Sequence, residues 1–362
     1  MHEVARYRQH NPDEDVLQAA VRRLRDIFDT FDSVAVCFSG GKDSLVVLHL
    51  ARLVAAEYGI DKLHVIFRDE ELIPDSVIDF VDGYRQEPWI DMRWYAVPLQ
   101  SSRLVLGTTL PYVQWDPARE WLRPKPPWAI TLREGDNRVF SQYTMDAFAS
   151  DELPGKVCFL TGLRAAESLM RLRGVLGKLN KPHVCTAGGG GTRVMLGRPI
   201  YDWWEEDVFK FFYDHGISYC ELYDRQLVGE RRTRSQTLRV STPLSSEPAK
   251  YLGTLRAIDP VFYGRLLRLF PGTDVMERYW SEYDRDAQAE EFGSSMDGVE
   301  RWIRKEYEGS ELLDKALAVL ASAKASARTR PTDFTPAYVF AQFTRGAWKR
   351  GSILPNTDIQ HK

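Results

Sequence analysis

The segment SVAVCFSGGKDS, residues 33–44, carries the strongest structural signal in the chain. The apolar run from Ser33 to Phe38 predicts a short buried strand, and the pattern from Asp43 to Tyr58 predicts a helix that ends at Gly59. A second apolar run, Leu63 to Phe67, begins about 30 residues after the first, which is the length of a βαβ unit. The sequence therefore predicts two parallel neighbouring strands joined by a helix.

Elements of the same kinds continue on both sides of this unit. A stretch rich in Trp and Pro, Ser101 to Asn137, predicts an irregular lid or insertion, and the glycines from Gly188 to Gly191 predict a loop or turn. The alternation of helices and strands indicates an α/β fold with a doubly wound, mostly parallel sheet. Further helices are expected at Asp13–Thr30, Pro74–Tyr84, Ser141–Ser150 and Trp204–His215, and further strands at Met92–Val97 and Lys156–Thr161.

Three regions are expected along the chain. Residues 1–30 hold an N-terminal helix that packs on the core, and residues 31–245 form the α/β domain with its insertion at 101–137. From residue 246 to residue 362 the apolar pattern becomes helical, which predicts a smaller helical domain with a terminal tail. Examples of its expected helices are Pro248–Ile258, Pro260–Leu269, Val299–Tyr307 and Leu312–Ala325.

The composition is that of an ordinary soluble protein. Of the 362 residues, 44% are hydrophobic and 27% are charged, and the formal net charge is -3. This charge argues against a basic body that coats nucleic acid, although a local basic site stays open. No apolar run approaches the roughly 20 residues of a membrane span, and the polar N-terminus has no signal-peptide core. We therefore expect a cytoplasmic protein without a membrane contact.

The four cysteines, Cys37, Cys158, Cys185 and Cys220, form no CxxC pair. Neither an iron–sulfur cluster nor a zinc site is predicted, and a disulfide framework is not expected at this chain length. Cys37 lies inside the first apolar strand, where we expect it to act as a small buried hydrophobe.

The loop after the first strand has the composition of a phosphate-binding loop. Glycines allow a tight turn in which several N–H groups face one anion, and the following helix adds the positive end of its dipole. Lys42 supplies positive charge for a polyphosphate, and Asp43 is expected to cap the helix or to hold Mg²⁺. The spacing differs from the GxxxxGK[ST] loop, which disfavours a γ-phosphate-transferring NTPase of that class. The expected ligand-binding residues are Ser39, Gly40, Gly41, Lys42, Asp43 and Ser44.

Three segments resemble motifs of a known superfamily. SGGKDS, residues 39–44, resembles the PP-loop of the adenine nucleotide α-hydrolase superfamily, which includes ATP pyrophosphatases, tRNA-thiolating enzymes and phosphoadenosine phosphosulfate (PAPS) reductases. TGLRAAES, residues 161–168, and RPIYDWWEEDV, residues 198–208, resemble motifs of the PAPS reductase family and occur in the same order. The resemblance covers about residues 30–245 and implies a Rossmann-like fold that binds ATP or a PAPS-like adenine nucleotide.

Within this family, two features look most similar to the subgroup of the immunoglobulin-binding regulator IbrA and its YbdN-type relatives. These features are the Trp/Pro-rich insertion and the segment RVSTP, residues 239–243. Members of the subgroup are described as PAPS reductase-like proteins that are often encoded beside a ParB-like protein. The resemblance therefore leaves a ParB-like partner open.

Polar residues follow the predicted strands at the edge where an open parallel sheet binds its ligand. The carboxylate of Asp69, after the second strand, is expected to accept a hydrogen bond from ribose or adenine. Gly162 and Arg164 follow a later strand, and Arg164 suits a phosphate or sulfate because its planar fork donates two bonds. Arg171 is a further candidate for a phosphate contact, with a solvated helix face as the alternative. Lys42, Asp43 and Arg164 are the expected catalytic residues.

The chain departs from the reductases where their thiol chemistry lies. Family reductases attack sulfur with a C-terminal cysteine, and no cysteine follows Cys220 here. Cys185 is a candidate replacement thiol, since Lys181 and His183 lie near it in the sequence. Arginines stand after the LYD segment, residues 222–224, where the family places cysteines, and arginines bind phosphate, sulfate or nucleic acid. They are Arg231, Arg232 and Arg234.

Three functions fit this pattern. The first is an enzyme that cleaves an adenine nucleotide at the α-phosphate, with Mg²⁺, and adenylates an acceptor. The second is a nucleotide-sensing regulatory or phage-conflict module that acts with a partner protein. The third is a PAPS-using enzyme that takes its nucleophile from a partner. The acceptor, the oligomeric state and the role of the helical region stay open.

Overall fold

The computed structural model describes residues 13–105, 108–167, 169–176, 181–187, 193–228, 243–244, 252–279, 285–344, 346–350 and 352–356. The described chain divides into two compact units. We call residues 13–103 and 111–273 the sheet unit, and residues 104–110 and 274–356, so far as they are described, the helical unit. No helix in the described ranges has the length and apolar character needed to cross a membrane.

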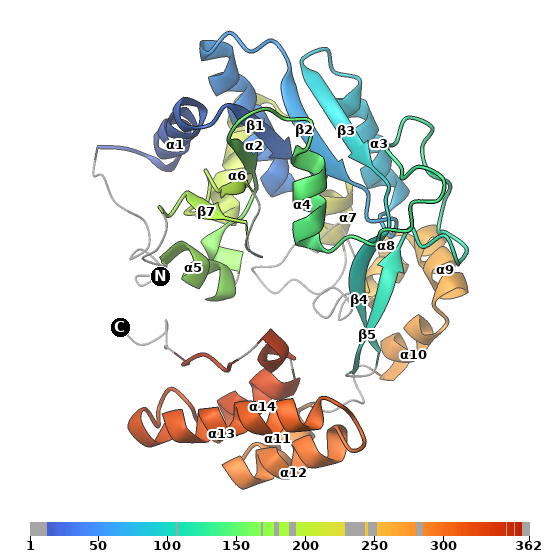
Figure 1. Cartoon of the computed structure of the whole chain (residues 1–362), viewed down its shortest axis with the longest axis vertical. Coiled ribbons are helices and arrows are strands. Elements are labelled where there is room, and N and C mark those ends of the chain that lie inside the picture. Colours follow the sequence, from blue (N-terminus) through green and yellow to red (C-terminus); the bar gives the residue numbers. More distant parts are fainter. Residues whose placement is uncertain are drawn as a thin grey trace. The chain divides into compact units, whose positions relative to one another are not determined.

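The sheet unit is built on six strands in the order β3-β2-β1-β6-β8-β7 (Figure 1). Each pair is parallel except the edge pair of β7 and β8, which is antiparallel. This confirms the predicted doubly wound, mostly parallel sheet. The strands are β1 Ser33–Cys37, β2 Leu63–Arg68, β3 Ile90–Tyr95, β6 Val157–Leu160, β7 Val184–Thr186 and β8 Val194–Gly197.

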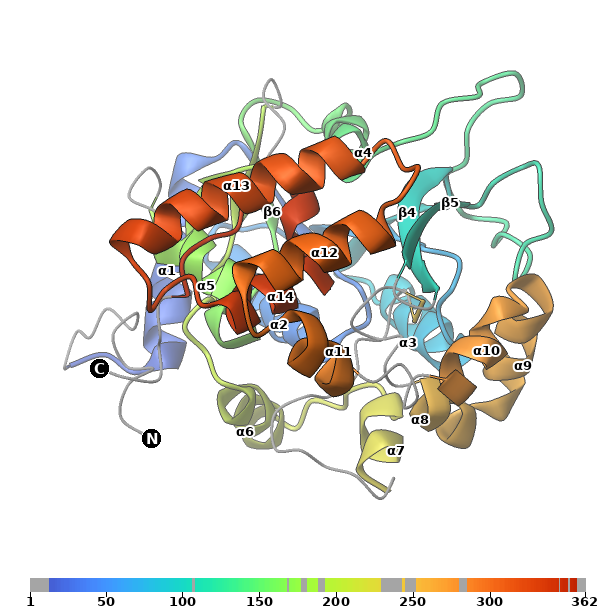
Figure 2. The same ribbon diagram turned by 90° about the horizontal axis from the view of Figure 1, so that it is seen from below.

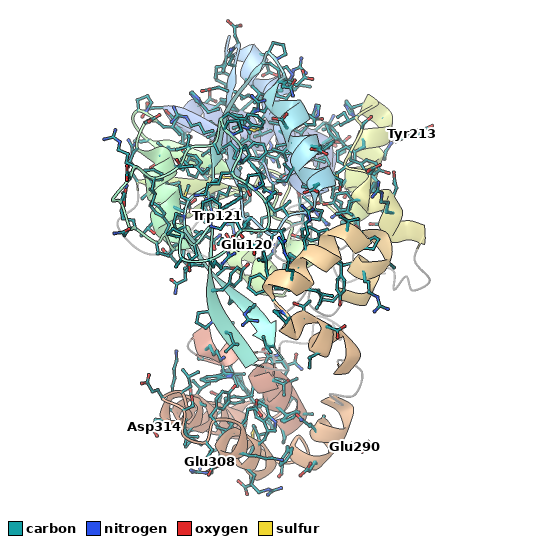
Figure 3. The ribbon with its side chains drawn as sticks, turned by 90° about the vertical axis from the view of Figure 1, so that its right-hand side faces the viewer. Glu120, Trp121, Tyr213, Glu290, Glu308 and Asp314 are labelled. Atoms are coloured by element: carbon teal, nitrogen blue, oxygen red, sulfur yellow. The ribbon has the colours of Figure 1, made fainter. Side chains whose placement is uncertain are left out.

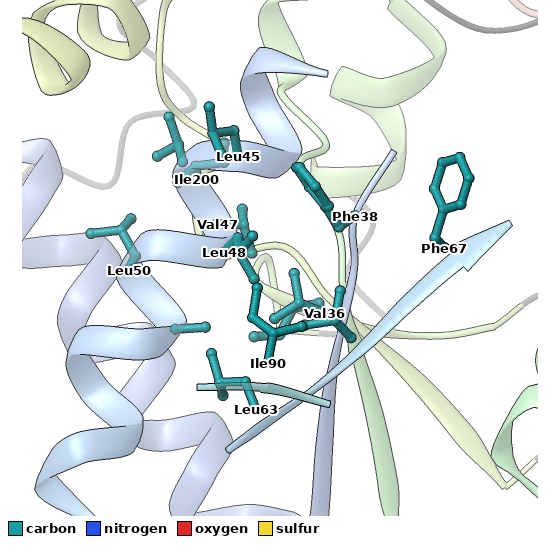
Figure 4. Packing of buried hydrophobic residues seen from close by; sticks show 14 of the residues in the cluster. Val36, Phe38, Leu45, Val47, Leu48, Leu50, Leu63, Phe67, Ile90 and Ile200 are labelled. Carbon is teal, nitrogen blue, oxygen red and sulfur yellow. The ribbon is translucent and has the colours of Figure 1, made fainter. Parts of the chain in front are cut away.

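Helices cover both faces of the sheet, because successive residues of its buried strands point to opposite faces. On one face, Val34 and Val36 of β1 pack with α1, α2, α3 and α6. Figure 4 shows Val36 in this cluster together with Val47 and Leu48 of α2. On the other face, Ala35 of β1 and Phe159 of β6 pack with α4. The helix bounds are α1 Val16–Thr30, α2 Lys42–Glu57, α3 Asp75–Arg85, α4 Gln142–Ser150 and α6 Glu205–His215.

These helices and strands start and end within a few residues of the predicted bounds. The helix α6 ends at Gly216, whose φ of 60° is left-handed, as the sequence predicted. The segment Ser101–Asn137 is only partly irregular, because it begins in a two-stranded ribbon that the sequence did not indicate. The expected loop at Gly188–Gly191 lies outside the described residues. The unpredicted elements are β4 Leu99–Val105, β5 Thr108–Gln114, β7, β8, α5 Leu169–Leu176 and α7 Leu222–Val228.

The helical unit has a core of its own. The rings of Trp302 and Phe340 meet edge to face with centroids 5.4 Å apart, and Trp348 and Ile353 close the same cluster. We expected the helical domain to begin at residue 246, but the division of the chain falls between Thr273 and Asp274. The helices α8 Leu252–Ile258 and α9 Pro260–Leu269 thus belong to the sheet unit, and α10 Gly272–Tyr279 crosses the division. The helical unit contains α11 Arg285–Phe292, α12 Met296–Glu306, α13 Leu313–Thr329 and α14 Pro336–Thr344 (Figure 2).

Candidate functional site

A cavity of about 410 Å³ opens where the parallel strands end. Its walls come from the carboxyl ends of β1, β2, β6 and β8, and from the loop between β1 and α2. Gln142 and Asp146 of α4, with Glu167 and Arg171, complete the lining. This is the edge of an open α/β sheet at which ligands bind. All of these residues belong to the sheet unit.

The loop between β1 and α2 turns through Gly40, whose φ of 74° favours glycine. A Cβ atom at this position would lie 2.8 Å from Cγ1 of Val77, so only glycine fits. The hydroxyls of Ser39 and Ser44 lie 3.1 Å apart across the loop, and the Ser44 hydroxyl donates to the carbonyl of Gly41. The loop is therefore held in one tight shape at the wall of the cavity.

The first turn of α2 presents a helix N-terminus to the cavity. Its N-cap residue is Gly41, which makes no side-chain cap hydrogen bond. The expectation that Asp43 caps the helix is wrong, because Asp43 lies inside the first turn. Because the N-cap residue supplies no side-chain acceptor, the positive end of the helix dipole stays available to stabilise an anion.

Three of the predicted site residues form a chain of ion pairs. Nζ of Lys42 lies 3.0 Å from Oδ2 of Asp43, and Nε of Arg164 lies 2.6 Å from Oδ1 of the same carboxylate. Both cations are buried, and Nζ of Lys42 also lies 3.6 Å from Oε1 of Glu205. The structure thus brings the three predicted catalytic residues together. The carboxylate of Asp43 holds the two cations beside the loop.

Gly162 brings the end of β6 against the start of α2. A Cβ atom on Gly162 would lie 2.5 Å from the carbonyl carbon of Asp43 and 2.6 Å from the backbone nitrogen of Ser44. Those atoms are backbone and cannot rotate away, so the close approach requires glycine. The predicted position of Gly162 beside the loop is therefore observed, through packing of backbone on backbone.

Tyr223 is a site residue that the sequence reading did not identify. Its hydroxyl accepts a hydrogen bond of 3.1 Å from the backbone N–H of Lys42, and its ring lies 5.6 Å from Nζ of Lys42. Burial raises the pKa of Tyr223 above its usual value, so the phenol stays protonated. The only sequence signal was the LYD segment, which resembles a packing block of the family.

Asp69 does not line the cavity; Glu70 and Arg68 do. The carboxylate of Asp69 accepts hydrogen bonds from Nε1 of Trp94 at 2.9 Å and from Nη2 of Arg123 at 2.5 Å. These donors occupy the oxygens that we expected to contact ribose or adenine. Asp69 instead helps to hold the Trp/Pro-rich insertion against the end of β2, through its ion pair with Arg123.

Glu71 also holds the Trp/Pro-rich insertion in place. Its side chain is fully buried and its φ of 62° is left-handed. Its carboxylate accepts from the backbone N–H of Trp115 at 2.6 Å and of Leu122 at 3.1 Å, and pairs with Arg119. Glu120 and Trp121, which Figure 3 labels, lie in the same loop. Asp69 and Glu71 therefore tie the insertion to the end of β2.

The predicted phosphate contacts differ in their surroundings. Arg171 lines the cavity, where its guanidinium pairs with Glu167. Arg231, Arg232 and Arg234 lie outside the described residues. Arg198, the first residue of the segment RPIYDWWEEDV, was not a predicted site residue, but it also lines the cavity and is 4% exposed.

Two of the four cysteines line the cavity, and neither has the environment of a reactive thiol. Burial raises the pKa of Cys185, and the nearby charge of Arg198 offsets only part of that rise. Lys181 and His183 do not activate this thiol, because both pair with Asp26. Cys37 is only half-buried and also lines the cavity, which corrects the prediction of a buried hydrophobe. Burial raises its pKa too, so both thiols are protonated at neutral pH.

The site's fit to Mg²⁺ is poor in this arrangement. Both oxygens of Asp43 already accept from cationic side chains. Among the residues that the structure describes, no group of three or more His, Cys, Asp or Glu side chains is placed to hold a metal ion. We therefore derive no step through a metal.

Residues 33–233 match the family model of the phosphoadenosine phosphosulfate reductase domain. The chain belongs to that family. The match begins at β1 and covers the loop, Gly162, Arg164, Arg198 and Tyr223. The PAPS reductase family thus accounts for the part of the chain that builds the cavity.

Individual relatives are distant. The chain is 27% identical over 261 residues to the uncharacterized protein YbdN of Escherichia coli, an alignment that covers 68% of this chain and 63% of YbdN. A Candida glabrata FMN adenylyltransferase, in complex with FAD and inorganic pyrophosphate, is 13% identical, with a TM-score of 0.41 over 72% of this chain and 89% of that chain. A Candida auris PAPS reductase in a phosphate complex is also 13% identical, with a TM-score of 0.32 over 64% of this chain and 93% of that chain.

Proposed function

We propose that this chain binds ATP or a related adenine nucleotide and transfers its AMP moiety to an acceptor, with release of pyrophosphate. The observation that carries the proposal is the ion-pair chain of Lys42, Asp43 and Arg164 beside a glycine loop at the N-terminus of α2. Oriented N–H groups, a helix dipole and fixed cations are what a polyphosphate requires.

The bonds of the proposed reaction can be assigned to this arrangement. An anionic oxygen of the acceptor, which carries no proton, forms a bond to the α-phosphorus, while the bond from that phosphorus to the oxygen bridging to the β-phosphorus breaks. The electron pair leaves with pyrophosphate, whose added charge the loop N–H groups and Lys42 stabilise. Arg164 pairs with the other oxygen of Asp43 and does not itself line the cavity, so its charge acts through space on the α-phosphoryl group.

Asp43 has a positioning role in this proposal. Its two oxygens hold Lys42 and Arg164 at fixed places, so neither cation must reorganise when charge develops on the phosphates. Glu70, which lines the cavity after β2, takes the role at ribose or adenine that the sequence suggested for Asp69.

The thiols give less support to reduction of a sulfonucleotide. A reductive step needs a thiolate, and burial raises the pKa of both Cys37 and Cys185. Adenylyl transfer needs no thiol, so it is the better match to the described cavity.

The test incubates the purified chain with Mg-ATP and, separately, with PAPS, and follows AMP, pyrophosphate and PAP. AMP with pyrophosphate supports the proposal. Tight nucleotide binding without products favours a nucleotide-sensing module that needs a partner, such as a ParB-like protein. PAP that forms only when a partner is added favours the sulfonucleotide alternative.

Variants test the site that the proposal uses. Lys42→Ala and Gly41→Val should each weaken ATP binding at least about tenfold, since they remove the buried charge and distort the loop. Lys62→Ala is the matched control, because Lys62 is exposed at the start of the strand β2. Unchanged ATP affinity in both loop variants would remove the premise of the proposal.

A further inference from the structure

We propose that Arg198 forms an oxyanion subsite in the cavity, and that this subsite binds a carboxylate or phosphate group of the acceptor molecule. The inference rests on the proposed adenylyl transfer and specifies its second substrate as a small acid. It begins from the hydrogen bonds of a single buried guanidinium.

Arg198 is fixed in place by its backbone and by one end of its side chain. Its N–H donates to the carbonyl of His183 at 2.8 Å, and Pro199 follows it. Nη1 donates to the carbonyl of Gly174 at 3.1 Å. The guanidinium therefore cannot swing freely in the cavity.

The other edge of the guanidinium has no partner in the described chain. Nε and Nη2 of Arg198 are both buried and neither makes a hydrogen bond. These two nitrogens lie on the same edge of the planar group, and together they form the fork that binds both oxygens of a carboxylate or phosphate. Leaving a buried charged group without hydrogen bonds is unfavourable, so this edge is suited to receive a ligand.

Arg198 differs from the other cationic side chains that line the cavity in its lack of an ion pair within the described residues. An arginine stays charged at all physiological pH values, so a buried one requires a counter-charge. Across the described residues, no carboxylate forms an ion pair with Arg198, whereas the other lining cations each have one. Their pairs are Lys42–Asp43, Arg68–Asp146 and Arg171–Glu167.

The position of Arg198 separates it from the phosphate loop. Arg198 follows the strand β8, and β6 lies between β8 and β1, which leads into the loop. Two strand spacings amount to about 10 Å. The loop and Arg198 thus border the same cavity from strands that are not neighbours. This arrangement suits two anionic groups of two different molecules, one on each side of the reacting phosphorus.

The test uses the full chain saturated with α,β-methylene-ATP, which fills the loop and cannot be cleaved at the α-phosphate. Sodium phosphate and sodium acetate are then titrated separately by calorimetry. Wild type should bind at least one of these anions, and Arg198→Met should weaken that binding at least about tenfold. Binding of phosphate alone assigns the subsite to a phosphate ester, and binding of acetate assigns it to a carboxylic acid.

A second variant and a control keep the test decisive. Arg198→Lys keeps the charge but removes the fork of two donors, so it should lower the affinity for the anion by about threefold or more. This variant also provides a test if Arg198→Met does not fold. Arg193→Met is the control and should leave anion binding unchanged, because within the described ranges Arg193 donates to backbone carbonyls, those of Ser150, Leu153 and Gly155.

Several results would overturn the proposal. One is that the wild type binds neither anion. Another is that both Arg198 variants bind the anion as tightly as the wild type does. A loss of α,β-methylene-ATP affinity as large as the loss of anion affinity would place Arg198 in the nucleotide's own phosphate site instead. Failure of the wild type to bind α,β-methylene-ATP at all would contradict the proposed function, which is a separate outcome.

Discussion

Arg164 donates from Nε to Oδ1 of Asp43 over 2.6 Å, although the two residues lie 121 positions apart in the chain. Their pair joins the segment after β6 to the first turn of α2. The phosphate loop is therefore not a self-contained motif. Its charge arrangement depends on a residue from the far side of the insertion.

A double-mutant cycle should measure this pair. Asp43→Asn should lower the free energy of unfolding by about 3–5 kcal/mol, since it leaves the buried charge of Arg164 without its partner. Arg164→Gln should lower it by less, because Asp43 still pairs with Lys42. The double variant should lose less than the sum, with a coupling of about 1–3 kcal/mol. Urea unfolding followed by tryptophan fluorescence gives these values. The exposed pair Arg25–Glu57 is the control and should couple far more weakly.

Gly162→Ala should damage the site through packing alone. Its new Cβ would overlap the backbone of Asp43 and Ser44, so we expect a loss of stability of about 2 kcal/mol or more and an ATP affinity at least about tenfold lower. Gly83→Ala is the control, because Gly83 lies within α3 with open space around it. It should raise stability by about 0.5–1 kcal/mol. An ATP affinity that Gly162→Ala does not change would refute the close approach.

Glu71→Gln should loosen the Trp/Pro-rich insertion. The change leaves the guanidinium of Arg119 without its buried counter-charge, which costs about 3–5 kcal/mol. Limited proteolysis should then cut between Trp115 and Trp128 faster than in the wild type. Glu87→Gln, in the turn before β3, is a control for general effects of charge removal. Equal cleavage rates in wild type and Glu71→Gln would contradict the anchoring role.

His49 should make stability depend on pH. Its Nε2 lies 2.8 Å from the hydroxyl of Tyr84, and burial, followed by the charge of Arg52, lowers the pKa of His49 to about 4. The unfolded chain takes up a proton at His49 near pH 6.5, while the folded chain does so only near pH 4. Stability should therefore be complete above pH 6.5 and fall as the pH drops toward 4.

The size of that loss can be bounded. Because His49 keeps some contact with solvent, we expect about 1–2 kcal/mol between pH 7 and pH 4.5, rather than the full value of the shift. His49→Asn cannot take up this proton, and its unfolding free energy should change less over the same range. Parallel pH curves for wild type and variant would rule out this contribution.

The sequence predicted the loop and its flanking elements because their signals are local. The run from Ser33 to Tyr58 contains its own strand, turn glycines and helix, and the observed β1 and α2 follow it closely. The ribbon of β4 and β5 was missed for a physical reason as well. Pro111 in β5 is a residue that disfavours strands, and a two-stranded ribbon tolerates it on an edge.

The roles of individual charged residues could not be read in the same way. Asp69, Glu70 and Glu71 are three carboxylates in a row, and the donors that distinguish them lie far along the chain, as Arg123 does for Asp69 and Arg119 for Glu71. Arg198 is the opposite case. Its significance lies in the absence of a carboxylate beside it in the described fold, and no local pattern encodes such an absence.

The distance along the chain between Asp43 and Arg164 also has a consequence for synthesis. A ribosome adds about 5–20 residues per second, so the loop waits about 6–24 s before its partner arginine is made. During that interval β1 has β2 as a neighbour but not β6. A nascent chain that ends before Arg164 therefore cannot close the pair, and nucleotide capture should begin only after Arg164 has been translated.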